Sequence, residues 1–218
     1  MATATITTRT PTVADLLGRF DEVLARRILL DPIPGTATVD DVVAIHAREK
    51  RLCELVDGIL VEKAMGYEES SLALILGHFL WTYLEGNPIG VAAGADGMMR
   101  LAPKLVRIPD VSFVSWDQFP DGIRAKGPVP AIHPDLAVEI LSESNTAAEM
   151  DRKLGDYFAA GTRIVWYMDP PSRTVRVFTA ADQVTVVDES GTLDGGDVLP
   201  GFRLAVRDWF ARAERPGG

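Results

Sequence analysis

Three charged residues that lie within otherwise apolar segments could together carry out phosphodiester hydrolysis. They are Asp110 in RIPDVSFV, Glu139 in PDLAVEIL and Lys153 in EMDRKLGDYF. Two carboxylates supply the oxygen ligands that a hard cation such as Mg²⁺ prefers. Such a cation lowers the pKa of a bound water and offsets the negative charge of the transition state, and a neighbouring lysine can orient that water or stabilise the charge.

The segment 136–141 predicts a strand in which Glu139 shares a face with apolar residues. Side chains alternate along a strand, so Leu136, Val138 and Ile140 point to the face opposite Glu139. A carboxylate among apolar neighbours is costly unless it is paired or bound to a cation. The alternative is a partly exposed glutamate on an edge strand. Asp110 raises the same question, and the preceding Pro109 indicates that its strand is irregular or near an edge.

The third charge, Lys153, lies on a predicted helix that Thr146 and Glu149 begin as a capping box and Gly161 ends. At about 100° per residue, Lys153 is at the border of the apolar stripe. Its side chain can extend outward to water or reach over the sheet toward Glu139, and helical geometry leaves both open. The stripe comprises Met150, Leu154, Tyr157 and Phe158.

The elements that must position these residues alternate between helix and strand, which predicts an α/β or α+β fold with a mixed sheet. We expect a hairpin at Asp57-Gly58, a helix over 70–85, strands near 89–93, 98–101, 106–114, 136–141 and 164–168, a hairpin of 174–179 and 184–187, and a closing helix over 204–212. Before them, we expect a capped helix after Thr12 and a second helix over 39–48. Residues 1–50 are therefore predicted as an N-terminal helical extension and 51–218 as the main domain.

Composition limits the function classes. The chain has 218 residues, and 22 Lys and Arg against 31 Asp and Glu give a formal charge of −9. This acidic balance is not the usual footprint of a nucleic-acid binder. The longest apolar stretch, 72–84, is shorter than the roughly 20 residues of a membrane span, so we expect no membrane role and a cytoplasmic location. The single cysteine, Cys53, excludes a disulfide within one subunit and is expected to be buried.

Six short motifs occur in an order that resembles the Uma-two family of restriction-endonuclease-like proteins, once filed as a domain of unknown function. They are ELVDG, RIPDVSFVSWDQFP, PDLAVEILSESN, EMDRKLGDYFAAG, VWYMDP and LPGF. The resemblance covers the chain from about Glu54 onward. It implies the α/β fold of the PD-(D/E)xK nucleases, a restriction endonuclease-like αβββαβ core around a mixed sheet, here with a C-terminal β-hairpin, and metal-dependent phosphodiester cleavage.

The resemblance also implies roles for individual residues. Asp110 matches the aspartate of the PD motif and Glu139 the second acid, so these two would hold Mg²⁺ or Mn²⁺. The usual lysine two positions later is replaced by Leu141, and Lys153 matches the lysine that this family carries on the following helix. Glu69, at the start of the first core helix, would be a supporting ligand or base-positioning residue, with Glu68 as a substitute. DNA as the substrate and a homodimer are implied as well.

Two other function classes stay open at this stage. The acidic charge and the missing standard lysine favour a catalytically inactive nucleic-acid-binding or oligomeric module with the same fold, whereas retention of the acids and the lysine disfavours it. A third interpretation is metal-dependent hydrolysis of a small phosphoester, which suits an acidic protein.

Several further charged residues are assigned by general expectation. Glu54 and Glu62 flank the predicted hairpin, where either could line the same cleft, but an exposed hairpin charge is the favoured interpretation. Basic residues that could line a groove, but are individually expected to be solvated, are Lys104, Arg107, Arg124 and Lys126. The histidines, expected to have no metal role because they lack a zinc-motif spacing, are His46, His78 and His133.

Overall fold

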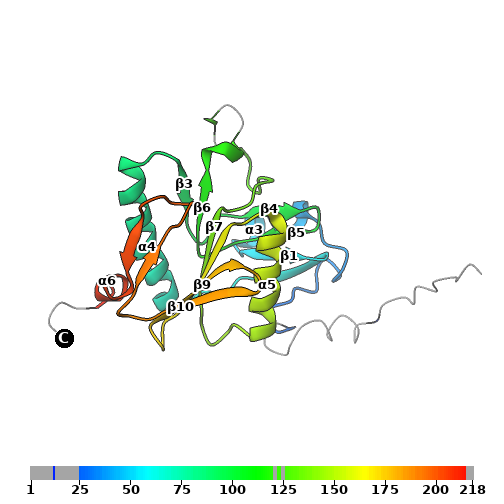
Figure 1. Ribbon diagram of the computed structural model, residues 1–218. Helices are drawn as coiled ribbons and strands as arrows, with labels where there is room; N and C mark the ends of the chain where they lie inside the picture. Colours follow the sequence, from blue (N-terminus) through cyan, green and yellow to red (C-terminus); the bar gives the residue numbers. More distant parts are fainter. Residues whose placement is uncertain (1–11, 13–24, 120–121, 124–125, 215–218) are drawn as a thin grey trace, which may run out of the picture.

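The computed structural model describes residues 12, 25–119, 122–123 and 126–214, and it is built around one mixed β-sheet with a helix on each face (Figure 1). The predicted helix after Thr12 and the side chain of Arg124 lie outside these residues. In chain order the elements are α3 (Val39–Glu49), β1 (Cys53–Val56), β2 (Ile59–Glu62), α4 (Tyr67–Gly86), β3 (Gly90–Ala93), β4 (Met99–Ala102), β5 (Leu105–Arg107), β6 (Val111–Ser115), the short 3₁₀ helix η1 (Trp116–Gln118), β7 (Leu136–Ile140), α5 (Ala147–Ala160), β8 (Ile164–Asp169), β9 (Thr174–Ala180), β10 (Gln183–Val187), β11 (Thr192–Asp194), β12 (Arg203–Ala205) and α6 (Val206–Ala211).

The main sheet has six strands in the order β10-β9-β8-β7-β6-β3. Strands β7 and β8 pair in parallel, and the other neighbours pair antiparallel. The helix α5 lies between β7 and β8 in sequence, as a parallel crossover requires. The succession α4, β3, β6, β7, α5, β8 thus confirms the predicted αβββαβ core and mixed sheet.

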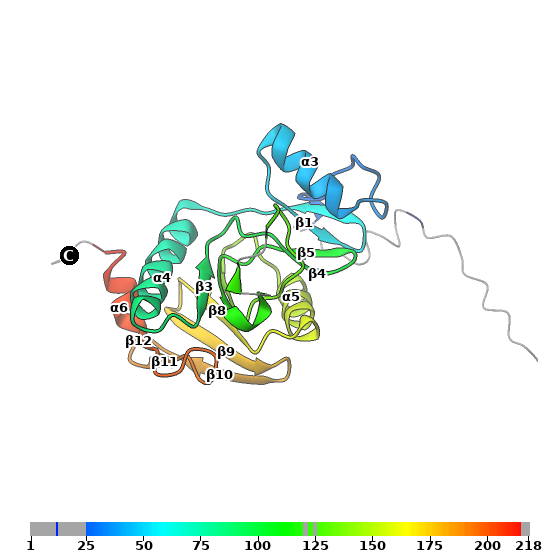
Figure 2. The ribbon, with the colours of Figure 1, turned by 90° about the horizontal axis from the view of Figure 1, so that it is seen from above.

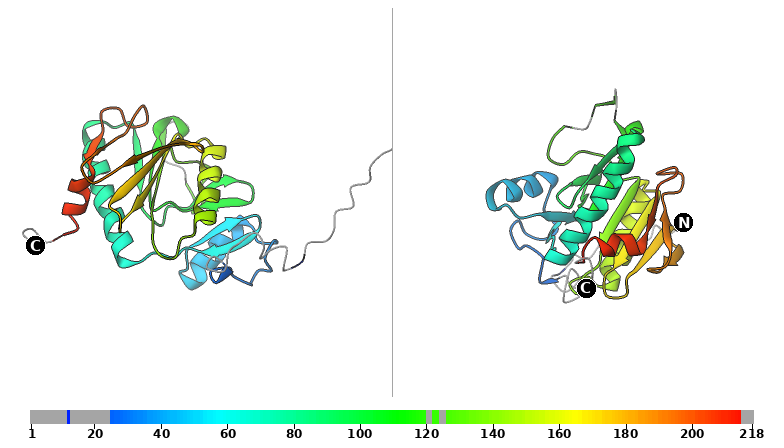
Figure 3. Two further views of the ribbon diagram at one scale, coloured as in Figure 1. Left: turned by 60° about the horizontal axis from the view of Figure 1, so that its bottom comes forward. Right: turned by 90° about the vertical axis from the view of Figure 1, so that its left-hand side faces the viewer.

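Helices α4 and α5 cover opposite faces of this sheet, as the views from above and below show (Figures 2 and 3). On one face, α4 and α6 pack on alternate residues of the central strands, including Val138 and Trp166. On the other face, α5 packs on the intervening residues, including Ala137 and Tyr167. Glu139 follows the Ala137 alternation, so it belongs to the α5 face.

A second, four-stranded sheet has the order β2-β1-β5-β4, and α3 packs against it. Its hairpin turns at Asp57 and Gly58, which both have positive φ (52° and 78°), as expected for an Asp-Gly turn. Cys53 is fully buried in the same hydrophobic cluster as Val42 and Ile45 of α3, and burial raises the pKa of its thiol to about 11.

The structure corrects two sequence predictions. The predicted strand over 106–114 is two strands, β5 and β6, that belong to different sheets. The break falls at Pro109, which has no N–H for a sheet ladder, while the backbone N–H of Ile108 is bound by the Glu54 carboxylate. The predicted closing helix over 204–212 begins with strand β12, and only 206–211 are helical in α6. Strand β12 pairs with β11, and β11 has only three residues, too few to give an alternating pattern in the sequence.

No helix among the described residues is long and apolar enough to cross a membrane.

Candidate active site

Asp110 and Glu139 are neighbours across the β6–β7 ladder. Val111 and Val138 form the last pair of the ladder, and Asp110 and Glu139 are the residues that adjoin this pair. The Asp110 backbone N–H donates to the Val138 carbonyl (3.0 Å), and the Ile140 N–H donates to Asp110 Oδ2 (2.8 Å). Both side chains are buried, so the alternative of an exposed glutamate on an edge strand is wrong because β7 is a central strand.

Lys153 reaches inward from α5 to Glu139. Its Nζ lies 3.2 Å from both Glu139 carboxylate oxygens and 3.3 Å from Glu54 Oε1. Tyr157, one helical turn later on the same face, donates its hydroxyl to Glu139 Oε1 at 2.6 Å. The alternative left open by helical geometry is thereby decided: the Lys153 side chain is 5% exposed and does not extend to water.

Two further charges come from the four-stranded sheet. Lys63, directly after β2, places its Nζ 2.7 Å from Asp110 Oδ1 and also donates to the Ile108 carbonyl. Glu54 of β1 accepts hydrogen bonds from Arg107 Nη1 (2.6 Å) and the Ile108 N–H (3.1 Å). Sequence reasoning gave Lys63 no role.

Glu54 and Arg107 correct two expectations. Glu54 is 3% exposed rather than an exposed hairpin charge, and Arg107 is equally buried, so it neither lines a groove nor is solvated. Arg107 also pairs with Asp156 of α5. Glu62 does lie toward the surface, where it pairs with Arg51. The signal that could have found Glu54 was present: it is a carboxylate inside the apolar segment CELV, as Glu139 is inside LAVEI.

We refer to Glu54, Lys63, Arg107, Asp110, Glu139 and Lys153 as the charged cluster. Its three carboxylates face three cations, which compensates the cost of burying them. Burial opposes ionisation of Glu54, but Lys153 and Arg107 outweigh it and lower the pKa of that carboxyl to about 2. Burial favours a neutral amine at Lys153, yet Glu139 and Glu54 raise its pKa and keep it charged. The pKa of Glu139 is raised, because burial and the nearby Asp110 carboxylate outweigh the opposing effect of Lys153.

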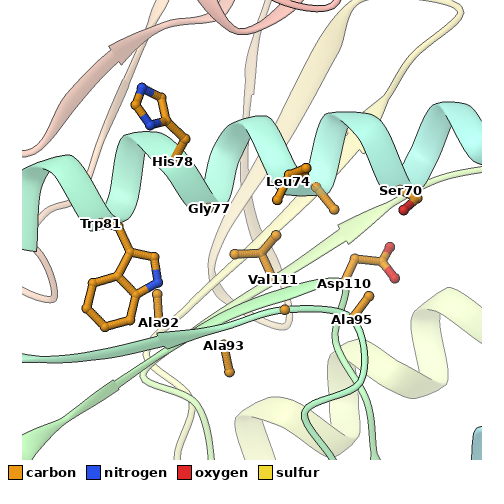
Figure 4. Close-up of a pocket in the computed structure, with 12 residues that line it drawn as sticks. Ser70, Leu74, Gly77, His78, Trp81, Ala92, Ala93, Ala95, Asp110 and Val111 are labelled. Carbon is orange, nitrogen blue, oxygen red and sulfur yellow. The ribbon is translucent and has the colours of Figure 1, made fainter.

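A cavity of about 460 Å³ between α4 and β3 reaches the cluster at Asp110 (Figure 4). Its walls are mostly small or apolar: Gly77 and Trp81 of α4 face Ala92 of β3, and Asp110 lies toward the end near Ser70. Asp110 is the member of the charged cluster that lines this cavity. The cavity thus reaches one of the two acids, Asp110, while Glu139 is not among its lining residues.

Glu69 lines a different cavity, of about 560 Å³, together with residues 141–144 that follow β7. Its carboxylate folds back over Gly66, where a Cβ would lie 2.3 Å from Oε2. The structure thus brings together Asp110, Glu139 and Lys153 but places Glu69 at the neighbouring cavity. The supporting role of Glu69 stays a prediction, as does that of Glu68, which lines the same cavity.

The donor set of the charged cluster fits a hard divalent cation chemically, because two adjacent carboxylates supply oxygen ligands. Glu139 Oε2 has the longer contact, 3.2 Å to Lys153 Nζ, whereas Asp110 Oδ1 is 2.7 Å from Lys63 Nζ and Oδ2 accepts the Ile140 N–H. Within the described part of the chain, no group of three or more His, Cys, Asp or Glu side chains is arranged to hold a metal ion. Two carboxylates would thus be the protein's ligands.

Fold and site together define a restriction-endonuclease-like domain with two buried acids and a helix-borne lysine. The family model Uma2, described as "Putative restriction endonuclease", matches residues 39–207, and the chain belongs to this family. Among solved structures, the chain is similar to a "putative nuclease belonging to DUF820" from Anabaena variabilis, with 19% identity and a TM-score of 0.69. That similarity covers 80% of this chain and 97% of the other, and it shows the shared fold. A comparison with curated proteins gave no match.

Proposed function

We propose that this protein is a metal-dependent DNA endonuclease in which Asp110 and Glu139 hold Mg²⁺ or Mn²⁺ and Lys153 assists. The observation that carries the proposal is the convergence of three side chains from β7, α5 and the residue before β6 at one point of the sheet. Membership of the Uma2 family supports a nuclease, and DNA is the substrate that such a nuclease would act on.

Each residue would have a distinct task. When bound, a divalent cation would supply Lewis-acid stabilisation of the phosphate and of its attacking oxygen. Asp110 is held for this by the Ile140 N–H, and Glu139 is oriented by the Tyr157 hydroxyl. Lys153 remains protonated beside Glu139, so its ammonium can stabilise negative charge that develops on the phosphate.

The substrate would approach Asp110 through the cavity between α4 and β3. The lining of small residues lets a strand come close to the sheet, and Trp81, 45% exposed, offers an aromatic surface on which a base can stack. Arg107 cannot contribute to phosphate binding because it is buried and paired, whereas Lys126 is exposed. A homodimer, which would bring two centres to a duplex, stays a prediction.

The test is nicking of supercoiled plasmid by the purified protein with Mg²⁺ or Mn²⁺. We expect metal-dependent nicking that Glu139→Ala and Lys153→Ala abolish, with Arg152→Ala as the matched control. Arg152 precedes Lys153 on α5 but pairs with Asp57 at the surface, so its removal should leave nicking unchanged. Circular dichroism of each variant confirms that the fold is retained. Nicking that persists undiminished in both site variants would contradict the proposal.

One observation favours a second candidate, a non-catalytic DNA-binding or oligomeric module. Every carboxylate of the charged cluster already has a cationic partner, so the buried site is neutral without a metal ion. This candidate predicts a protein that binds DNA or self-associates but never nicks plasmid, with or without a divalent cation. Gel-shift and nicking assays on the same preparation separate the two functions.

A further inference from the structure

Lys63 makes the shortest ion pair to either of the predicted metal ligands. Its Nζ is 2.7 Å from Asp110 Oδ1, and its side chain is 6% exposed. The same ammonium is fixed by the Ile108 carbonyl, and its charge also acts on the carboxylates of Glu54 and Glu139. Lys63 is thus a buried positive charge that faces three acids.

The position of this ammonium matters because of how the Asp110 carboxylate is used. Oδ2 accepts the Ile140 N–H, whereas Oδ1 is paired with the Lys63 ammonium, so both oxygens of this carboxylate have a partner. A cation that binds Asp110 through Oδ1, the oxygen that accepts no backbone N–H, would lie beside the Lys63 ammonium. Because ammonium and metal ion are both positive, their simultaneous presence at this one oxygen would be repulsive.

We propose that Lys63 occupies the cation position of the acid pair and must leave Asp110 before a divalent ion binds. The inference rests on the proposed metal site and adds a competing internal cation to it. The Lys63 ammonium can move while its backbone N–H stays bonded to the Leu52 carbonyl, because Lys63 follows the last residue of β2 and the next residue, Ala64, is exposed. Lys153, in contrast, is bound between Glu139 and Glu54 and would stay.

The first test is calorimetric titration of Mn²⁺ into the wild type, Lys63→Met and Lys104→Met. Removal of a charge-assisted hydrogen bond that competes with the metal should tighten Mn²⁺ binding by roughly tenfold or more in Lys63→Met. Lys104→Met removes an exposed lysine from the same four-stranded sheet region and should bind Mn²⁺ as the wild type does. Equal or weaker binding by Lys63→Met overturns the proposal.

The second test uses the wild-type protein and so does not depend on the folding of a variant. Surface lysines are acetylated with an activated ester, and the modification of each lysine is measured by mass spectrometry. We expect Lys63 to be protected without metal and to become several-fold more reactive at the Mn²⁺ concentration that saturates the titration, while Lys104 does not change. Reactivity of Lys63 that is unchanged by saturating Mn²⁺ refutes the displacement.

These outcomes separate the proposed metal site from the role of Lys63. If wild type and Lys63→Met both bind Mn²⁺ with the same affinity, the metal site stands and the competition by Lys63 is refuted. If neither protein binds Mn²⁺, the proposed metal site fails, and the inference about Lys63 fails with it.

Discussion

Replacement of Glu54 by glutamine should destabilise the protein by about 3 kcal/mol at pH 7. The Glu54 carboxylate accepts hydrogen bonds from Arg107 and the Ile108 N–H, and Lys153 lies 3.3 Å away. These cations, opposed by burial and helped by Lys63, lower the pKa of Glu54 from its ordinary value of 4.5 to about 2. At about 1.4 kcal/mol per pH unit, that difference stabilises the folded state by about 3 kcal/mol, which agrees with the roughly 3–5 kcal/mol lost when a buried ion pair is broken.

The sign of the pH dependence follows from the lowered pKa. The folded state holds fewer protons than the unfolded state between the two pKa values, so stability falls as the solution is acidified. The contribution of Glu54 is complete above about pH 4.5 and is lost progressively as the pH falls toward about 2. The difference in stability between wild type and Glu54→Gln should therefore be constant at neutral pH and shrink over that acidic range.

Chemical denaturation across this pH range measures the effect, and a thermal melt at pH 7 should show a midpoint lower by roughly 6–12 °C for a protein of this size. Glu62→Gln is the matched control, because Glu62 is in the paired strand of the same hairpin but its side chain is 37% exposed. Its substitution should leave stability nearly unchanged. A Glu54→Gln protein as stable as the wild type at pH 7, or a difference that does not shrink on acidification, would refute the reasoning.

Two further substitutions test the cavity that reaches Asp110 and the hydrogen bond that holds Glu139. Gly77→Leu should stabilise α4, because a Cβ at Gly77 meets no atom within 4 Å and glycine costs a helix interior about 1 kcal/mol. It should also reduce nicking, because the new side chain enters the cavity that Asp110 lines. Higher stability with undiminished nicking would show that the substrate does not use this cavity. Tyr157→Phe removes the hydrogen bond to Glu139 Oε1 and should lower the free energy of unfolding by roughly 1.5–3 kcal/mol in urea denaturation, whereas an unchanged value would mean that this hydrogen bond contributes nothing.

The fold was predictable from local signals where an element is long or its turn is distinctive. The Asp57-Gly58 hairpin, the helix α5 with its Gly161 end and the alternation around Glu139 are all confirmed. The split between β5 and β6 was not predicted, since an apolar run interrupted by one proline has the same local pattern whether its halves share a sheet or not. That choice depends on pairing with β1, some 50 residues earlier in the sequence.

For the site, the sequence indicated Asp110, Glu139 and Lys153 as charges within apolar segments, but it left open whether Lys153 turns toward Glu139. Lys153 and Glu139 are separated by 14 residues and converge through one strand-to-helix connection. Lys63 lies 47 positions before Asp110 and approaches it from the other sheet, so no spacing rule relates the two. Glu54 and Arg107 were misassigned because a charged residue near a turn is usually solvated, and their burial depends on each other.

The break at Ile108 and Pro109 also has a mechanical consequence. Only Ile108, Pro109 and Asp110 separate β5 from β6, so the connection between the two sheets is short. The ion pairs Lys63–Asp110 and Glu54–Lys153 span the same junction. Rotation of the four-stranded sheet relative to the six-stranded sheet would lengthen both ion pairs at once. The two sheets should therefore move as a single rigid body while these ion pairs are intact.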